Sequence, residues 1–143
     1  MTLPDETTYR FVAVLNKKAE LGRLLNALGH MTAGLVGAYS KTNDLCFLEY
    51  HDADGGLHPS ISHFPFIVLK ADNSNQIRTL RAQLIEKGLP CNDFTSTMTV
   101  GSSEEQQEAT RNTPEAELEY FGVCTFGTTD TLKTLTKKFQ LFR

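Results

Sequence analysis

Three residues near the start of the chain have types and spacing that suit ligand binding. Arg23, Asn26 and His30 fall within Glu20–Tyr39, a stretch with the periodicity of a helix. Arg23 and His30 are seven residues apart, which is two helical turns or ~10.5 Å along the axis. Long side chains at these two positions can therefore reach one ligand. A histidine on a helix is more often a structural hydrogen-bond partner than a catalyst, so the pair needs further support.

A second group of polar side chains lies in the segment His51–His63. It offers five candidate metal ligands, which are His51, Asp52, Asp54, His58 and His63. Their spacing matches no compact zinc pattern. The sequence Asp52-x-Asp54-Gly55 also lacks the glutamate that ends a calcium-binding loop. A polar hairpin loop explains the same residues, and we expect no metal and no cofactor.

The sequence carries few motifs for covalent chemistry. It has no G-x-S-x-G, no phosphate-cradling glycine loop and no paired-carboxylate motif. Its three cysteines, Cys46, Cys91 and Cys124, include no C-x-x-C pair, which argues against a disulfide framework and a thiolate zinc site. We interpret them as reduced, small apolar residues of a cytosolic protein. The alternative is a catalytic thiolate, which needs a base nearby in space.

Short apolar runs alternate with helical segments along most of the chain. The expected strands are Tyr9–Leu15, Leu45–Tyr50, Phe64–Lys70, Cys91–Val100 and Tyr120–Phe126. The expected helices are Glu20–Tyr39, Gln76–Lys87, a short acidic helix that begins at a capping box of Ser103 and Gln106, and Thr131–Lys137. This order predicts an α/β fold with three layers, α/β/α, around a mixed, mostly parallel sheet. Ligands bind such sheets at the carboxyl ends of the strands.

Length and charge limit the possible partners. The 143 residues fit one domain, 9–143, after a loose leader, Met1–Thr8. No apolar run approaches the ~20 residues that span a bilayer, and the first ten residues do not resemble a secretory signal. We therefore expect a cytoplasmic protein without a membrane partner. The net charge of −3 disfavours RNA, although the segment Lys133–Arg143 is basic.

The long predicted helix carries two stripes. One is apolar and is expected to face the core: Leu21, Leu24, Leu25, Leu28, Met31 and Leu35. The other consists mostly of small residues: Gly22, Asn26, Gly29, Ala33 and Gly37. A glycine inside a helix costs roughly 1 kcal/mol relative to alanine. Something must therefore come close to this backbone, through tight packing within the fold, a partner subunit or a ligand.

Several short segments resemble the type II peptidyl-tRNA hydrolases. The segment Gly22–His30 (GRLLNALGH) is similar to the opening of that family's first helix, and Gly88-Leu89-Pro90 with Asp93 and Thr97 looks like its Gly-Leu-Pro turn and Asp-x-x-x-Thr strand. The final segment, Asp130–Phe142, is similar to its closing helix and tail. Leu15-Asn16-Lys17 followed by Leu25-Asn26-Ala27 and His30 resembles more closely an uncharacterised bacterial group, the domain of unknown function two thousand, which shares the hydrolase fold.

The resemblance carries over only where the working residues match. It implies catalytic positions at Arg23, Asp93 and Thr97, but Arg23 stands where the family has a lysine and Ala27 where it has a glutamine. An arginine stays charged and does not act as a base, whereas its forked donors can hold a carboxylate, a phosphate or an ester oxygen. The altered site therefore suits anion binding better than proton transfer.

Three hypotheses follow. The first is a binding or regulatory domain, expected to be a homodimer, that holds a small anionic ligand through Arg23, Asn26 and His30, with Asp93 nearby. The second is a hydrolase of esters such as peptidyl-tRNA, in which Asp93 orients water or the substrate and Arg23 steadies the oxyanion. The third is a structural homo-oligomer with the small-residue stripe as its interface.

Overall fold

The computed structural model describes residues 2–143, so Met1 of the predicted leader lies outside the described residues. Its elements follow in the order β1 (Tyr9–Asn16), α1 (Leu21–Ala38), η1 (Thr42–Leu45), β2 (Phe47–His51), β3 (Leu57–Ser62), β4 (Phe66–Ala71), α2 (Ser74–Glu86), β5 (Cys91–Thr95), η2 (Ser96–Met98), α3 (Ser103–Arg111), η3 (Glu115–Glu117), β6 (Tyr120–Thr128), α4 (Thr129–Thr136) and β7 (Gln140–Leu141). The end of the leader is held in place, because Thr129 donates hydrogen bonds to the carbonyl oxygens of Thr7 and Thr8.

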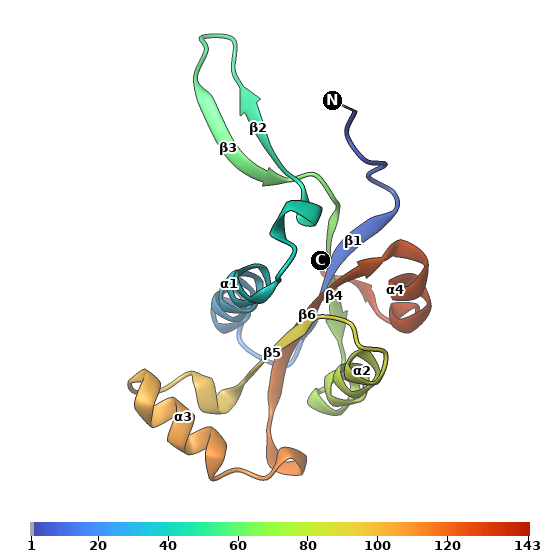
Figure 1. The fold of residues 1–143 in the computed structure, drawn as a ribbon. Helices are drawn as coiled ribbons and strands as arrows, with labels where there is room; N and C mark the ends of the chain where they lie inside the picture. Colours follow the sequence, from blue (N-terminus) through green and yellow to red (C-terminus); the bar gives the residue numbers. More distant parts are fainter. Residues whose placement is uncertain (1) are drawn as a thin grey trace.

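A five-stranded sheet in the order β5-β6-β1-β4-β7 forms the centre of the molecule (Figure 1). Only β1 and β4 pair in parallel, and the other three pairings are antiparallel. The prediction of a mostly parallel sheet is therefore wrong, although the sheet is mixed. Strands β1, β4 and β5 do run in the same direction, as helical crossovers require. However, β6 inserts between β5 and β1 in the opposite direction, and alternation of elements does not specify that insertion.

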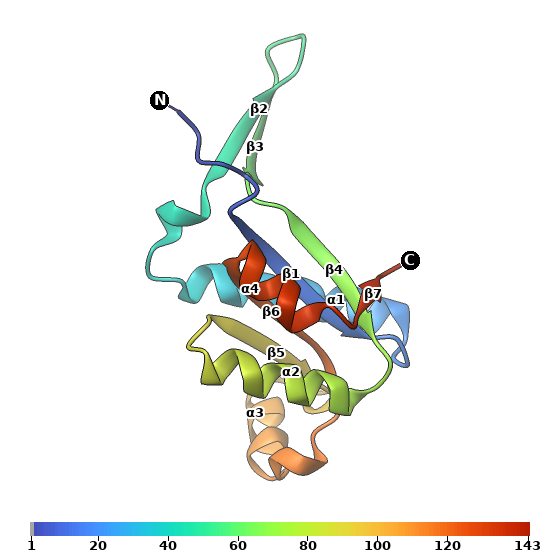
Figure 2. The ribbon, with the colours of Figure 1, turned by 90° about the vertical axis from the view of Figure 1, so that its right-hand side faces the viewer.

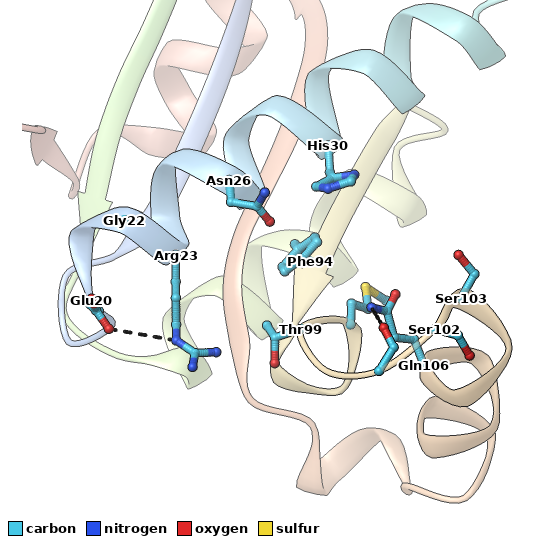
Figure 3. Close-up of a pocket in the computed structure, with 12 residues that line it drawn as sticks. Glu20, Gly22, Arg23, Asn26, His30, Phe94, Thr99, Ser102, Ser103 and Gln106 are labelled. Carbon is cyan, nitrogen blue, oxygen red and sulfur yellow. Dashed lines mark hydrogen bonds and ion pairs between the residues drawn. The ribbon is translucent and has the colours of Figure 1, made fainter.

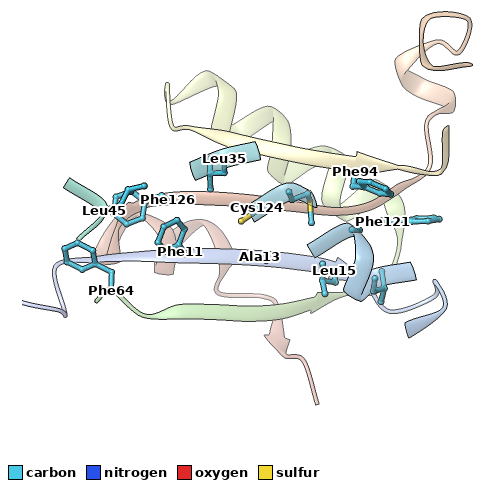
Figure 4. Close-up of a cluster of buried hydrophobic side chains, with 13 residues drawn as sticks. Phe11, Ala13, Leu15, Leu35, Leu45, Phe64, Phe94, Phe121, Cys124 and Phe126 are labelled. Atoms are coloured by element: carbon cyan, nitrogen blue, oxygen red, sulfur yellow. The ribbon is translucent and has the colours of Figure 1, made fainter. Parts of the chain in front are cut away.

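Helices lie on both faces of this sheet (Figures 1 and 2). Alternate residues of β1 point to opposite faces, as the pleat of a strand requires. Phe11, Ala13 and Leu15 join the buried cluster beneath α1, which Figure 4 shows. Val12 and Val14 join the cluster on the face of α2 and α4. Because both faces of β1 are covered, its residues on both sides are buried, which explains its continuous apolar sequence.

Helix α1 packs on the sheet through a narrower stripe than its sequence predicts. Its buried residues are Leu24, Ala27, Met31 and Leu35. Leu21 and Leu25 were expected to face the core, but they are 56% and 59% exposed.

Two glycines lie at close contacts between α1 and the sheet. One is Gly34 of α1, where an added Cβ would lie 2.6 Å from Nδ2 of Asn92 on β5, and the other is Gly122 of β6. A Cβ added to Gly122 would lie 2.9 Å from Cε of Met31 and 2.8 Å from Cδ2 of Leu15. Added Cβ atoms at Gly22, Gly29 and Gly37 of α1, in contrast, would meet no described atom within 4 Å. Tight packing within the chain therefore does not explain the small-residue stripe.

The strands β2 and β3 form a separate antiparallel hairpin that projects from the domain (Figures 1 and 2). A hairpin loop lies within His51–His63 as predicted, but it is shorter than predicted, because Leu57–Ser62 forms the strand β3. Asp52 organises the turn, because its Oδ1 accepts hydrogen bonds from the backbone N–H groups of Asp54 and Gly56, and its Oδ2 lies 2.9 Å from Nε2 of His58. In residues 2–143, no three His, Cys, Asp or Glu side chains converge on a point that could hold a metal ion.

The remaining observations concern the start of α3 and the character of the helices. The capping box of α3 lies one residue earlier than predicted, because Ser102 and Glu105 form it rather than Ser103 and Gln106. Across the described part of the chain, none of the helices combines the length and the apolar character needed to cross a membrane.

Candidate functional site

A concave region of the described surface lies between the first turns of α1, the end of β5 and the start of α3. It has a volume of about 780 Å³, and we call it the α1–α3 cleft (Figure 3). Its lining residues are Glu20, Gly22, Arg23, Asn26, His30, Phe94, Met98, Thr99, Gly101, Ser102, Ser103 and Gln106. The three predicted ligand-binding residues, Arg23, Asn26 and His30, therefore line one cavity.

The start of α1 is positioned by the end of β1. Asn16 is buried, donates from Nδ2 to the carbonyl oxygen of Tyr120 over 3.1 Å, and accepts from the backbone N–H of Lys18 over 3.0 Å. These bonds fix the loop between β1 and α1 against the neighbouring strand β6. The cleft thus adjoins the carboxyl end of a sheet strand, where α/β proteins commonly bind ligands.

Arg23 carries the positive charge of the cleft. Its side chain is 52% exposed, and its Nε lies 3.9 Å from Oε2 of Glu20, at the outer limit of an ion pair. Exposed pairs of this kind contribute little because water screens them. In Figure 3 the Arg23 side chain extends toward Glu20, along the edge of the cleft. Its guanidinium group is therefore free to turn toward a ligand without breaking a strong interaction.

His30 and Phe94 form the apolar wall of the cleft. The two rings stack with centroids 5.8 Å apart and an angle of 26° between their planes (Figure 3). Phe94 is buried in the core beneath α1, so it fixes the imidazole from below. Among residues 2–143, neither His30 nor Asn26 has a side-chain hydrogen-bond partner. Both polar groups are available to a molecule in the cleft.

The first turn of α1 also lacks the usual compensation of a helix N-terminus. Glu20 occupies the N-cap position but makes no side-chain capping bond, and the first turn holds no acidic residue. A helix begins with N–H groups that have no partner within the helix, and Gly22 leaves them uncovered because it has no side chain. This end of the cleft therefore presents open backbone N–H groups and the Arg23 guanidinium group, with the Glu20 carboxylate beside them.

The N-terminus of α3, on the opposite side of the cleft, satisfies its own groups. The backbone N–H of Glu105 donates to Oγ of Ser102, the backbone N–H of Ser102 donates to Oε1 of Glu105, and Glu104 adds a second acid to the first turn. Gly101 precedes this cap with a φ of +72°, which glycine adopts without strain. This side supplies hydroxyl and amide groups rather than charge.

The two other predicted catalytic residues lie elsewhere. Asp93 is on β5, next to Phe94, and therefore points to the opposite face of the sheet, where its Oδ2 accepts a 2.7 Å hydrogen bond from Nε of Arg81. Thr97 lies in η2 and its hydroxyl is 2.7 Å from those of Thr95 and Thr110. The structure brings neither Asp93 nor Thr97 into the cleft with Arg23.

Asp93 belongs to a charged cluster around the ring of Tyr120. The guanidinium groups of Arg78 and Arg81 lie 5.2 and 5.9 Å from the ring centroid. The phenol donates a 2.9 Å hydrogen bond to Glu115, which also accepts from Nε of Arg78. Burial, reinforced by the bond to Glu115, raises the pKa of Tyr120 to about 12. We call these residues the Tyr120 cluster. Its members are far apart along the sequence, so no local motif predicts the cluster.

Cys91 and Cys124 lack the environment of a catalytic thiolate. Burial raises the pKa of the Cys124 thiol to about 12 and also raises the pKa of Cys91. A reactive cysteine needs the opposite shift, toward a lower pKa. The three thiols are unpaired, with Cys124 in the core and Cys46 and Cys91 half-buried. Their interpretation as small apolar residues therefore fits the fold.

Comparison with known proteins places the chain in a family. A family model described as a protein of unknown function, DUF2000, matches residues 9–143. The chain belongs to this family. The solved structure of a protein of unknown function, Atu0240, from Agrobacterium tumefaciens strain C58 is similar to it, with a TM-score of 0.80 and 15% sequence identity over 95% of this chain and 98% of that one. No curated protein matches the chain. The structural similarity to Atu0240 shows the fold alone, so the chemistry of the cleft is argued from its residues.

Proposed function

We propose that the protein is a binding or regulatory domain that holds a small anionic ligand in the α1–α3 cleft. The observation that carries the proposal is Arg23, which is weakly paired and stands beside the uncapped first turn of α1 in a cavity of about 780 Å³. A guanidinium group and open helix N–H groups both favour negative charge. The ligand class is a carboxylate or a phosphate.

The remaining lining suits a ligand that also has an apolar part. Phe94 and Met98 provide apolar surface, and Asn26, Thr99 and Gln106 provide hydrogen-bonding groups around it. Small-molecule sites commonly combine an apolar lining with a few polar groups that fix orientation. The anionic end would meet Arg23 and the N–H groups of the first turn, and the apolar end would rest on Phe94.

We propose that the fold is similar to that of the type II peptidyl-tRNA hydrolases but that the protein does not share their reaction. The Gly-Leu-Pro turn at residues 88–90 and the Asp-x-x-x-Thr segment that begins at Asp93 support that likeness. Hydrolysis is the weaker candidate because Asp93 is bound to Arg81 on the far face of the sheet from Arg23. A water molecule oriented by Asp93 would not meet an oxyanion held by Arg23.

Calorimetric titration of the full chain tests the binding proposal. The probes are inorganic phosphate and an aromatic carboxylate, benzoate. We expect at least one of them to bind the wild-type protein, and we expect Arg23→Ala to weaken that binding by roughly 10- to 100-fold, because hydrogen bonds to charged groups contribute ~1.5–3 kcal/mol.

Arg143→Ala is the matched control, because it removes an exposed arginine at the opposite end of the chain. It should leave the affinity for the probe unchanged. Equal affinities of the wild-type protein and Arg23→Ala, or no binding of either anion, would refute the proposal.

A further inference from the structure

Helix α1 presents an apolar ridge to solvent. Residues four apart on a helix form one continuous row on its surface. One such row runs the length of α1 and is exposed at every position. Its members are Leu21, Leu25, Gly29, Ala33 and Gly37. No polar side chain interrupts this row.

The ridge is complementary to itself in size. Its first two residues are large leucines, its last two are Ala33 and Gly37, and Gly29 lies midway between them. A two-fold axis through Gly29 would set a second α1 antiparallel to the first. Each leucine would then face a small residue of the second copy: Leu21 would face Gly37, and Leu25 would face Ala33. Aligned rows of this type are the commonest way in which two helices pack, at a crossing angle near −50°.

Charge favours the same arrangement. Within residues 21–38, Arg23 is the only side chain with a full charge; it lines the α1–α3 cleft and is not a member of the ridge. The last turn of α1 has no basic residue, so the negative end of its dipole is not neutralised by a side chain of the helix, whereas Glu20 places a carboxylate at the N-cap. An antiparallel copy brings the positive end of each helix beside the negative end of the other.

The buried area decides how tight such a dimer can be. A helix of 18 residues is ~27 Å long, and a strip ~10 Å wide along all of it covers roughly 270 Å² on each copy. This is an upper limit, because helices that cross at about −50° diverge toward their ends. The total of roughly 540 Å² is below the ~1,200 Å² of standard stable interfaces and falls in the class of weak, transient ones. The ridge alone therefore supports a dimer that dissociates on dilution.

We propose that α1 forms the centre of a weak, antiparallel homodimer with its two-fold axis at Gly29. The small residues at Gly29, Ala33 and Gly37 are then explained by the close approach of a second helix. The proposal does not depend on the function of the α1–α3 cleft, because no residue of the ridge lines the cleft.

Substitution at the two-fold axis gives the first test. An added Cβ at Gly29 meets no described atom of its own chain within 4 Å, so Gly29→Leu fits the monomer and raises its helix propensity. In the dimer the two new side chains would collide. By sedimentation velocity from roughly 1 µM to 1 mM, a range that brackets weak association, we expect the wild-type protein to show a concentration-dependent dimer and Gly29→Leu to stay monomeric with a higher melting temperature.

Ala82→Leu is the matched control, because Ala82 is exposed on α2. It adds the same apolar bulk elsewhere and should dimerise like the wild-type protein. A wild-type protein that stays monomeric across this range, or a Gly29→Leu variant that dimerises as well as the wild-type protein, would overturn the proposal.

A size swap tests the register. Leu25→Ala leaves a gap opposite Ala33, and Ala33→Leu places two leucines against each other, so each single variant should weaken the dimer at least tenfold. The double variant Leu25→Ala with Ala33→Leu restores one large and one small residue in each pair and should dimerise as the wild-type protein does. A double variant as weak as the worse single variant would exclude this antiparallel register.

Discussion

The two faces of the sheet use arginine in opposite ways. On the face of α2, Nε of Arg81 lies 2.7 Å from Asp93, and the two side chains are only 33% and 22% exposed. On the face of α1, Nε of Arg23 is 3.9 Å from Glu20, and its side chain is 52% exposed. Arg81 is therefore committed to holding α2 against β5, whereas Arg23 is available to a ligand. A charged residue that the fold does not use for its own stability is the better candidate for function.

The comparison predicts opposite consequences for stability when each arginine is removed. Arg81→Ala leaves the Asp93 carboxylate half-buried without its partner and takes one cation from the ring of Tyr120. Loss of a partner from a buried charged pair costs several kcal/mol, and a surface pair costs ~1 kcal/mol or less. We expect a loss of about 2 kcal/mol in the free energy of unfolding for Arg81→Ala and less than ~0.5 kcal/mol for Arg23→Ala. Urea denaturation of the wild-type protein and the two variants measures both losses. Equal losses would contradict the contrast between the two faces.

The pH dependence of stability tests the Tyr120 cluster, which lies on the same face of the sheet as Arg81. The pKa of Tyr120 is raised from the ordinary tyrosine value of 10.0 to about 12 in the folded protein, so the folded state favours the neutral phenol. This contribution is complete below pH 10 and is lost as the pH rises from 10 toward 12. We expect a loss on the order of 2 kcal/mol across that interval, measured as the urea midpoint at each pH.

Tyr120→Phe is the control for this pH effect. It keeps the ring beneath Arg78 and Arg81 and removes the ionisable hydroxyl group. Its stability should fall less steeply above pH 10 than that of the wild-type protein. An equally steep fall in both proteins would assign the effect to other groups.

The sequence predicted the cleft residues of α1 better than the residues that face them. Arg23, Asn26 and His30 lie on one helix, where spacing determines which side chains share a side. Asp93 was grouped with them through the resemblance to a family, although side chains alternate along a strand and Phe94, the next residue, is the one that lines the cleft. The contributions of Met98, Ser102 and Gln106 depend on how the segment after β5 folds back, which has no local signature.

The errors in the fold have a similar origin. Leu21 and Leu25 have the periodicity of core residues, yet they are exposed because α1 meets the sheet through a narrower stripe. The direction of β6 was missed because an antiparallel strand between β1 and β5 depends on a long-range pairing. Local patterns therefore identified most strands and helices, and tertiary pairing determined the sheet.

The two helix N-termini of the cleft provide the finest test of the comparison. The N-terminus of α3 is closed by the Ser102–Glu105 box, and that of α1 begins at Glu20 without a capping bond. Aspartate is a good N-cap residue and has the same charge as glutamate, so Glu20→Asp should cap α1 and raise the free energy of unfolding by ~0.5–1 kcal/mol. The new cap occupies N–H groups that we assign to the ligand, so the affinity for the anionic probe should fall several-fold.

Ser102→Ala is the reciprocal change, because it opens the capping box of α3. It should lower the free energy of unfolding by about 1 kcal/mol and leave the affinity for the probe within about twofold of the wild-type value, because the anion is assigned to α1. Calorimetric titration and urea denaturation of both variants separate stability from binding. A gain in stability for Glu20→Asp without any loss of affinity would show that the N–H groups of α1 do not contact the ligand and would leave Arg23 as its main contact.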